Sequence, residues 1–301
     1  MQPDWRRLYP FDSQTMRGDG LNYHYLDEGD GEPLLMVHGN PTWSFYWRNL
    51  VIAFRDQCRV VVPDHIGCGM SDKPQRYQYT LQQHIDNLCQ LVERLDLRQV
   101  TLLAHDWGGA IGLGAALAHQ NRFARIVLFN TGAFPPPYVP WRILCCRIPW
   151  LGTWAMRRWN LFARSALTMA TECPRTLSPE IRAGLLAPYD NWQRRVAIDA
   201  FVRDIPLSRR HPTFPVLQRI ENHLPELSDL PVLLAWGMKD WCFRPECLER
   251  LQAVFSAAEV HRLTDAGHYV IEDACDEIIA ILSKFFQQHP VAGKGLQVYT
   301  P

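Results

Sequence analysis

The sequence has no excess of charge of either sign. Its 301 residues include 31 lysines and arginines and 31 aspartates and glutamates, so the formal net charge is zero. Because a protein that binds a nucleic-acid backbone needs surplus basic side chains, nucleic-acid binding is a poor hypothesis. A long apolar run is also missing. The amino terminus lacks a secretory signal, and the most apolar segment, residues 142–159, contains Arg147, Arg157 and Arg158. We therefore expect a soluble, cytoplasmic protein.

The sequence also lacks the cysteine spacing of a metal site or a disulfide framework. It has nine cysteines, an odd number, and no C-x-x-C pair. Small disulfide-rich domains and zinc sites show regular pairs instead. We expect reduced, mostly buried thiols, and we expect neither a metal nor a cofactor.

Short apolar runs indicate the fold class. Branched and aliphatic residues fill residues 34–37, 60–62, 100–104, 126–129 and 232–236, and each run ends in turn or polar residues. Runs without alternation are typical of strands that are covered on both faces, as in a parallel sheet. Between them, segments such as residues 81–95 carry apolar side chains at helical spacing. The alternation predicts an α/β fold with a mostly parallel central sheet.

This alternation stops after Asn130. Residues 135–211 are rich in proline and have no strand pattern, so we predict a helical cap over 135–211 and a core domain over 1–134 and 212–301. Residues 135–210 contain twelve arginines, no lysine and five acidic residues, a net charge of +7. The arginines could form a solvated face, meet an acidic partner or steady a developing carboxylate.

The cap segment also concentrates large apolar residues. They are Trp141, Ile143, Leu144, Ile148, Trp150, Leu151, Trp154, Met156 and Trp159. These side chains could form the core of the cap or line a tunnel for a small hydrophobic substrate. They could also dock the protein to a membrane surface or within a multi-enzyme assembly. The sequence leaves these alternatives open.

A sharp turn between a strand and a helix carries the first chemical signal. The run at 100–104 is followed by HDWGG and then by a helix of small residues. A crowded turn of this kind needs small residues two positions before and after its apex, here Ala104 and Gly108, which makes Asp106 the apex. An apex residue in such a turn is a nucleophile at the edge of a sheet, although an isolated aspartate before a helix is more often a cap.

Three further segments favour the nucleophile. Asp240 follows the strand at 232–236, and His268 follows a short strand-like run at 260–263. The order nucleophile, acid, histidine is the one used in the fold that carries its nucleophile at such a strand-to-helix turn, and each of the three residues follows the carboxyl end of a strand. Upstream, the turn His38-Gly39-Asn40-Pro41 follows another strand and could lend an N–H group to a developing anion.

These motifs resemble the α/β-hydrolase superfamily over the whole chain and, within it, the haloalkane dehalogenases. The resemblance rests on HGNPTWSFYWRNL, PDHIGCGMSDKP, HDWGG and DAGH. It implies that Asp106 forms an alkyl ester, that His268 activates water, and that Asn40 and Trp107 hold the leaving group. Some of these enzymes carry the acid at the position of Asn130. That departure leaves Asp240 as the acid, with Asp265 and Glu272 as alternatives.

The residue types suit this chemistry. An aspartate is ionised at neutral pH and attacks without a base, whereas a serine needs one. The leaving anion needs neutral donors, which the Trp107 and Asn40 side chains can supply. His268, oriented by an acid, is free for a second step.

The cap segment resembles one subgroup of this family more specifically. Residues 160–207 are similar to a subgroup that includes the β-lactone decarboxylase of bacterial olefin synthesis. This resemblance implies a lyase that converts a cis-3-alkyl-4-alkyloxetan-2-one into a cis-alkene and CO2, with attack on either the ring carbon or the carbonyl. The alternative is a haloalkane dehalogenase. A less favoured one is an epoxide hydrolase, which would use Tyr138 or Tyr189 of the cap, and another is a non-catalytic binding protein.

Overall fold

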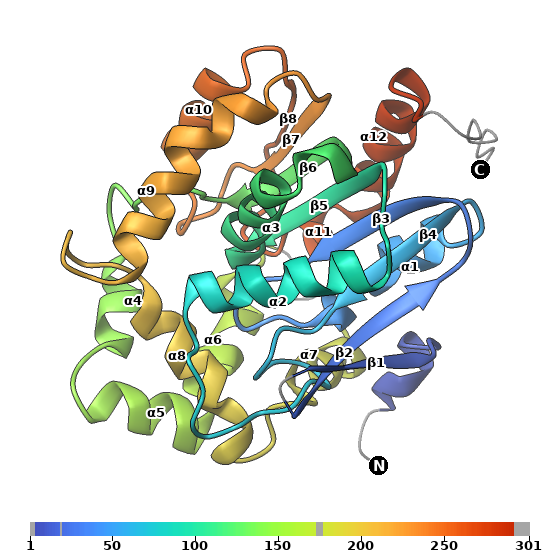
Figure 1. Cartoon of the computed structure of the whole chain (residues 1–301). Helices are drawn as coiled ribbons and strands as arrows, with labels where there is room; N and C mark the ends of the chain where they lie inside the picture. The colour runs from blue at the N-terminus through green and yellow to red at the C-terminus, as the bar shows by residue number, and fades with distance from the viewer. Residues whose placement is uncertain (1–3, 19, 173–176, 292–301) are drawn as a thin grey trace.

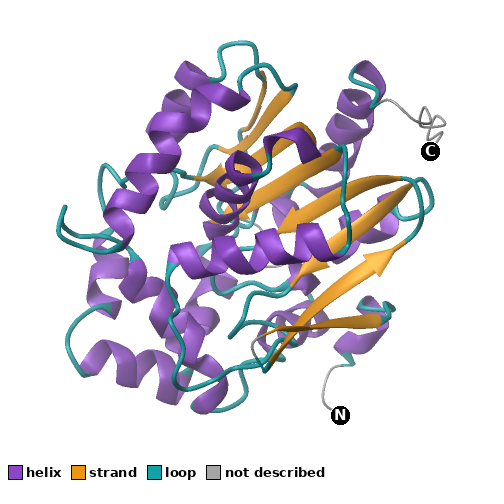
Figure 2. Ribbon diagram, in the orientation of Figure 1, coloured by secondary structure: helices purple, strands orange, loops and turns teal. Residues whose placement is uncertain are grey.

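An eight-stranded sheet forms the centre of the protein (Figures 1 and 2). The computed structural model describes residues 4–18, 20–172 and 177–291, so parts of the predicted core and cap ranges lie outside the described residues. The strand order is β1-β2-β4-β3-β5-β6-β7-β8. β2 pairs antiparallel with β1 and β4, and all other neighbours are parallel. The predicted α/β class with a mostly parallel sheet is confirmed.

The strands are β1 (Ser13–Gly18), β2 (Leu21–Glu28), β3 (Glu32–Val37), β4 (Cys58–Pro63), β5 (Val100–Asp106), β6 (Phe123–Thr131), β7 (Val232–Gly237) and β8 (Glu259–Leu263). The helices are α1 (Arg48–Phe54), α2 (Leu81–Arg94), α3 (Trp107–Ala118), α4 (Trp141–Cys146), α5 (Leu151–Trp159), α6 (Leu161–Met169), α7 (Pro179–Leu186), α8 (Val196–Asp204), α9 (Thr213–His223), α10 (Pro245–Val254), α11 (Val270–Asp273) and α12 (Cys275–Gln288).

Helices cover both faces of the sheet, which explains the uninterrupted apolar runs. Leu35 and Val37 of β3 pack into one cluster with α2, α3, α9 and α10, whereas Leu34 and Met36 pack into a second cluster with α1, α11 and α12. Successive side chains of a strand point to opposite faces, so each buried strand needs apolar residues at every position. The expected helix at 81–95 is α2, which begins after Thr80, whose hydroxyl accepts a hydrogen bond from the Gln83 N–H.

The strands β1 and β2 were missed by the sequence analysis. Their side chains are mostly exposed or half-buried, and only Tyr23, His24 and Leu26 of β2 are buried. This edge pair is not covered on both faces, so it has no continuous apolar run. A search for such runs therefore finds only the parallel part of the sheet.

The helices α4 to α8 lie between β6 and α9 and gather at one end of the sheet (Figure 1). The boundaries that we predict, after residues 134 and 211, fall in the loops that precede α4 and α9. This segment has a small cluster of its own around Ile143, Met156 and Val202. Across the described ranges, no helix combines the length and the hydropathy that a membrane span requires.

A buried ion pair connects β3 and β6 in the middle of the sheet. Arg125 of β6 donates to Glu32 Oε2 of β3 at 2.7 Å, to Thr101 Oγ1 of β5 at 2.8 Å and to the His289 carbonyl oxygen after α12 at 2.8 Å. The side chain of Arg125 is 1% exposed and that of Glu32 10%. Removing one partner of a buried pair leaves the other charge without compensation.

We expect Arg125→Met to lower the free energy of unfolding by about 3–5 kcal/mol, because Glu32 stays buried and unpaired. Arg98→Met is the control, since Arg98 and Asp96 form an exposed pair whose loss costs below about 1 kcal/mol. Urea denaturation of both variants measures the difference. Equal losses in the two variants would contradict the stabilising role of the buried pair.

Candidate active site

Asp106 lies at a strained turn at the end of β5. Its φ of 54° and ψ of −129° are unfavourable for a residue with a side chain. Two glycines permit the turn: a Cβ atom on Gly108 would lie 2.1 Å from the Val37 carbonyl oxygen, and one on Gly39 would lie 2.0 Å from Asp106 Oδ1. Within α3, which the structure describes in full, Asp106 makes no side-chain capping bond. The arrangement favours the nucleophile interpretation over the helix cap.

The Asp106 carboxylate is buried between hydrogen-bond donors and a histidine. Oδ1 accepts the backbone N–H of Asn40 at 2.7 Å, and Oδ2 lies 3.6 Å from His268 Nε2. Burial raises the pKa of Asp106 above its usual range, although His268 and the backbone N–H groups of Trp107 and Asn40 oppose the shift. The turn at Gly39-Asn40 thus directs its N–H at the carboxylate itself.

His268 bridges the two aspartates. Its Nδ1 donates to Asp240 Oδ2 at 2.8 Å, and its Nε2 faces Asp106. Burial alone would lower the pKa of His268, but the charge and hydrogen bond of Asp240, together with the charge of Asp106, raise it. The structure brings the three residues of the predicted nucleophile, acid and histidine together at the carboxyl ends of β5, β7 and β8.

Asp240 is held by residues around it. Its Oδ2 also accepts a hydrogen bond from Asn130 Nδ2 at 3.0 Å, and its Oδ1 accepts the Cys242 N–H at 2.6 Å. Asn130 is itself fixed to Gly237, since its Oδ1 accepts the Gly237 N–H at 2.7 Å and its Nδ2 donates to the Gly237 carbonyl oxygen at 2.9 Å. Asn130 therefore fixes the position of the Asp240 carboxylate.

The two alternative acids are engaged elsewhere. Glu272 is buried and accepts two hydrogen bonds from Arg48, at 2.5 and 2.8 Å. Asp265 is 91% exposed and pairs with Lys239. Only Asp240 of the three candidates contacts His268.

Two supporting residues were not predicted. His105 Nε2 donates to the His268 carbonyl oxygen at 2.8 Å, and the two rings lie 4.6 Å apart. Burial, and next the charge of His268, lower the pKa of His105 well below its usual range, so this ring is neutral. Phe243 stacks on the His268 ring, with the two ring centres 5.7 Å apart and the ring planes inclined by 20°. The signal for His105 was its place in HDWGG, next to Asp106.

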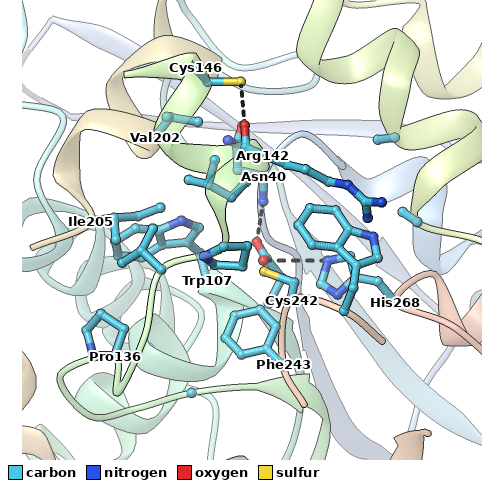
Figure 3. A pocket seen from close by; sticks show the side chains of 18 of the residues that line it. Asn40, Trp107, Pro136, Arg142, Cys146, Val202, Ile205, Cys242, Phe243 and His268 are labelled. Atoms are coloured by element: carbon cyan, nitrogen blue, oxygen red, sulfur yellow. Dashed lines mark hydrogen bonds and ion pairs between the residues drawn. The ribbon is translucent and has the colours of Figure 1, made fainter. Parts of the chain in front are cut away.

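A cavity of about 380 Å³ opens in front of the carboxylate (Figure 3). Asp106, His268, Asn40 and Trp107 contribute to its wall, and most of the other wall residues are apolar. Asn40 Nδ2 makes one long hydrogen bond of 3.3 Å to the Ile198 carbonyl oxygen. The two predicted side-chain donors therefore lie at the same cavity as Asp106.

The cap tyrosines are differently placed. Tyr138 lines the cavity, but its hydroxyl donates to the Cys242 carbonyl oxygen at 2.6 Å. Tyr189 is buried outside the cavity wall, and its hydroxyl donates to the Thr42 carbonyl oxygen at 3.3 Å. Burial raises the pKa of both phenols, so neither geometry nor acidity favours proton donation to a leaving alkoxide.

The sequence matches the α/β hydrolase fold family over residues 32–144 and 142–274. The chain belongs to this family. The predicted superfamily and fold are confirmed, since the haloalkane dehalogenase DatA of Agrobacterium tumefaciens superposes with a TM-score of 0.83 at 26% identity, covering 92% of this chain and 96% of that one.

Two kinds of enzyme are similar in sequence. A cis-3-alkyl-4-alkyloxetan-2-one decarboxylase of Shewanella oneidensis is 40% identical over 287 residues, which cover 93% of this chain and 90% of that protein. Haloalkane dehalogenase 2 of Mycobacterium tuberculosis is 33% identical over 283 residues, with 93% and 96% covered. This family is thus shared by a lyase and a hydrolase.

We expect the His268 imidazole to titrate above the usual histidine pKa of about 6.5, because two carboxylates face it. Asp240→Asn should lower that pKa, since burial then acts with only Asp106 opposing it. Histidine-labelled NMR spectra recorded against pH measure the midpoint.

Asp265→Asn is the matched control, because this carboxylate is exposed and pairs with Lys239. It should leave the His268 midpoint unchanged. A midpoint that is equally displaced by Asp265→Asn, or unmoved by Asp240→Asn, would contradict the pairing.

Proposed function

We propose that this protein is a β-lactone decarboxylase that converts a cis-3-alkyl-4-alkyloxetan-2-one into a cis-alkene and CO2. The observation that carries the proposal is the Asp106 carboxylate facing an apolar cavity beside the neutral donors of Asn40 and Trp107. The higher identity to the oxetanone decarboxylase than to the dehalogenase favours the lyase.

In the first step, Asp106 attacks the sp³ ring carbon that bears the ring oxygen. The bond from this carbon to the ring oxygen breaks, and its electron pair leaves as a carboxylate on the neighbouring carbon. The backbone N–H groups of Asn40 and Trp107 already face Asp106 and are not free for a tetrahedral oxyanion. That arrangement favours attack on the ring carbon over attack on the carbonyl. The side-chain donors of Trp107 and Asn40 then receive the new carboxylate.

In the second step, the alkyl ester eliminates. The bond between the carboxylate and its carbon breaks and releases CO2, its electron pair forms the alkene, and the Asp106 carboxylate departs. Displacement inverts the attacked carbon, which places the ester antiperiplanar to the carboxylate while both alkyl groups stay on the same side. Anti elimination then gives the cis-alkene, and neither water nor a redox partner is consumed.

His268 assists the second step by its charge. Its pKa is raised, and its Nε2 lies 3.6 Å from Asp106 Oδ2, so the imidazolium favours the return of negative charge to the aspartate. In a dehalogenase the same histidine acts as the base that activates water. Asp240 orients the ring in both cases, Asn130 positions Asp240, and His105 holds the His268 backbone.

Haloalkane hydrolysis is the second candidate, because two neutral donors at the leaving-group position also suit a halide. In that reaction water attacks the ester carbonyl, so one oxygen of Asp106 comes from water. The epoxide reaction is disfavoured by the engaged hydroxyls of Tyr138 and Tyr189.

We expect the purified protein to release alkene from a synthetic cis-dialkyl β-lactone, measured by gas chromatography. In ¹⁸O-labelled water, Asp106 should stay unlabelled after many turnovers, as read by mass spectrometry of its peptide, because elimination returns its own oxygen. Asp106→Ala should abolish turnover. Unchanged lactone, or label in Asp106 during alkene formation, would contradict the lyase mechanism, and a bromoalkane with higher kcat/KM would favour the dehalogenase.

We expect Trp107→Phe to slow the first step by about 10²-fold, by analogy with the loss of an oxyanion donor. The aromatic ring is kept, so its contact with Phe201 at 5.5 Å is preserved. Single-turnover kinetics measure the step. A Trp107→Phe enzyme that reacts at the wild-type rate would show that Trp107 does not stabilise the leaving group.

A cytoplasmic location belongs to the same proposal. The eight described cysteines are free thiols, as is usual in a reducing compartment. Cell fractionation tests it, because recovery of the protein from the secreted or cell-surface fraction would contradict the proposal.

A further inference from the structure

The segment from α4 to α5, including the loop between them, exposes an unusual set of large apolar side chains. Their exposed fractions are 69% for Trp141, 44% for Ile148, 89% for Trp150, 56% for Leu151, 44% for Trp154 and 52% for Trp159. Figure 1 shows α4 and α5 at the outer edge of the molecule, away from the sheet. We call these six side chains the tryptophan face. Soluble monomers rarely expose so many apolar groups together, and such a patch marks an interaction site.

The backbone holds one of these residues outward. Trp150 precedes α5 with φ of 61° and ψ of −52°, a conformation that a bulky residue rarely adopts. Trp150 is also the most exposed of the large apolar residues. Strain of this kind persists where the surrounding structure imposes it and is common at binding sites.

The same segment of sequence is positively charged, although Asp190, in the loop after α7, lies beside Arg158 and Trp159 in space. Residues 107–171 contain no aspartate or glutamate, whereas α4 to α6 and their connections contain five arginines. Arg142, Arg158 and Arg164 are exposed. The Arg142 guanidinium lies over the rings of Trp141 and Trp241, 5.6 and 5.1 Å from their centres. Tryptophan beside arginine is the combination that binds the interface of an anionic bilayer.

The tryptophan face adjoins the cavity. Trp141, Arg142 and Leu161 are exposed and also line the cavity that contains Asp106. A molecule too apolar to dissolve in water could therefore pass from a bilayer to the site without crossing the solvent.

We propose that the tryptophan face docks the protein on the surface of an anionic lipid bilayer. The aromatic side chains insert among the headgroups and the arginines contact lipid phosphates, with the cavity opening toward the membrane. This inference goes beyond the proposed function, because vesicle binding is measured without substrate and holds for a lyase or a hydrolase.

The test is sedimentation of the full chain with vesicles of phosphatidylcholine, alone or mixed with phosphatidylglycerol. We expect binding to the anionic vesicles, weakened by salt, and quenching of tryptophan fluorescence by brominated lipid. Trp150→Glu and Arg158→Glu should each weaken this binding by about tenfold. Neither side chain lines the cavity, so turnover of a water-soluble short-chain substrate should be unchanged in both variants.

Two variants of the core domain are matched controls. Ile52→Glu changes an apolar side chain on α1 that is 45% exposed, and Arg98→Glu changes an arginine before β5 whose side chain is 68% exposed. Both should bind vesicles as the wild type does. The proposal is overturned if the wild type stays in the supernatant, or if the controls lose as much binding as the variants of the face. It is also overturned if size-exclusion chromatography shows an oligomer that Trp150→Glu dissociates while no vesicle binding occurs, which would make the face an interface between copies.

Discussion

The buried charge of Asp106 is the constraint on which the rest of the site depends. A carboxylate inside an apolar cavity is unstable unless donors and an opposite charge surround it. The turn at the end of β5 exposes Asp106 to the cavity only because Gly39 and Gly108 leave room for it. The Asn40 N–H then satisfies one oxygen, and His268 faces the other. The carboxylate is therefore held at the cavity wall in a form that could attack without a general base.

The same constraint explains why the histidine is held so firmly. An imidazolium that stabilises the carboxylate must keep its Nδ1–H toward Asp240 and its Nε2–H toward Asp106. Asn130 fixes the acid, His105 fixes the backbone of His268, and Phe243 stacks on its ring. These contacts come from β6, β5 and the loop after β7, so the parallel sheet itself sets the geometry. In parallel sheets, functional side chains gather where strands end at their carboxyl edge.

This placement is also why much of the site was predictable. Asp106, Asp240 and His268 each follow an apolar strand run, and their order along the chain agrees with the order of the strand ends. The supporting residues were harder to find, since Asn130 and His105 act through hydrogen bonds between segments over 100 residues apart. The edge strands β1 and β2 were missed because they lack two covered faces. The sequence does not tell which apolar cap residues are buried, because helical spacing does not reveal which faces other elements cover. The structure shows that Met156 is buried and Trp150 is exposed.

The leaving-group donors do not by themselves separate a lyase from a hydrolase. A halide and a carboxylate are both anions that a neutral Trp107 or Asn40 side chain can stabilise. The difference arises after the ester has formed. A simple alkyl ester of Asp106 stays bound until water attacks it, so a hydrolase must hold water near His268 Nε2. An ester that carries a carboxylate on the adjacent carbon contains its own electron pair for elimination, and loss of CO2 returns the negative charge to Asp106, which the Asn40 N–H and His268 face. One arrangement of residues can therefore support either outcome, and the substrate that the cavity admits determines which bond breaks second.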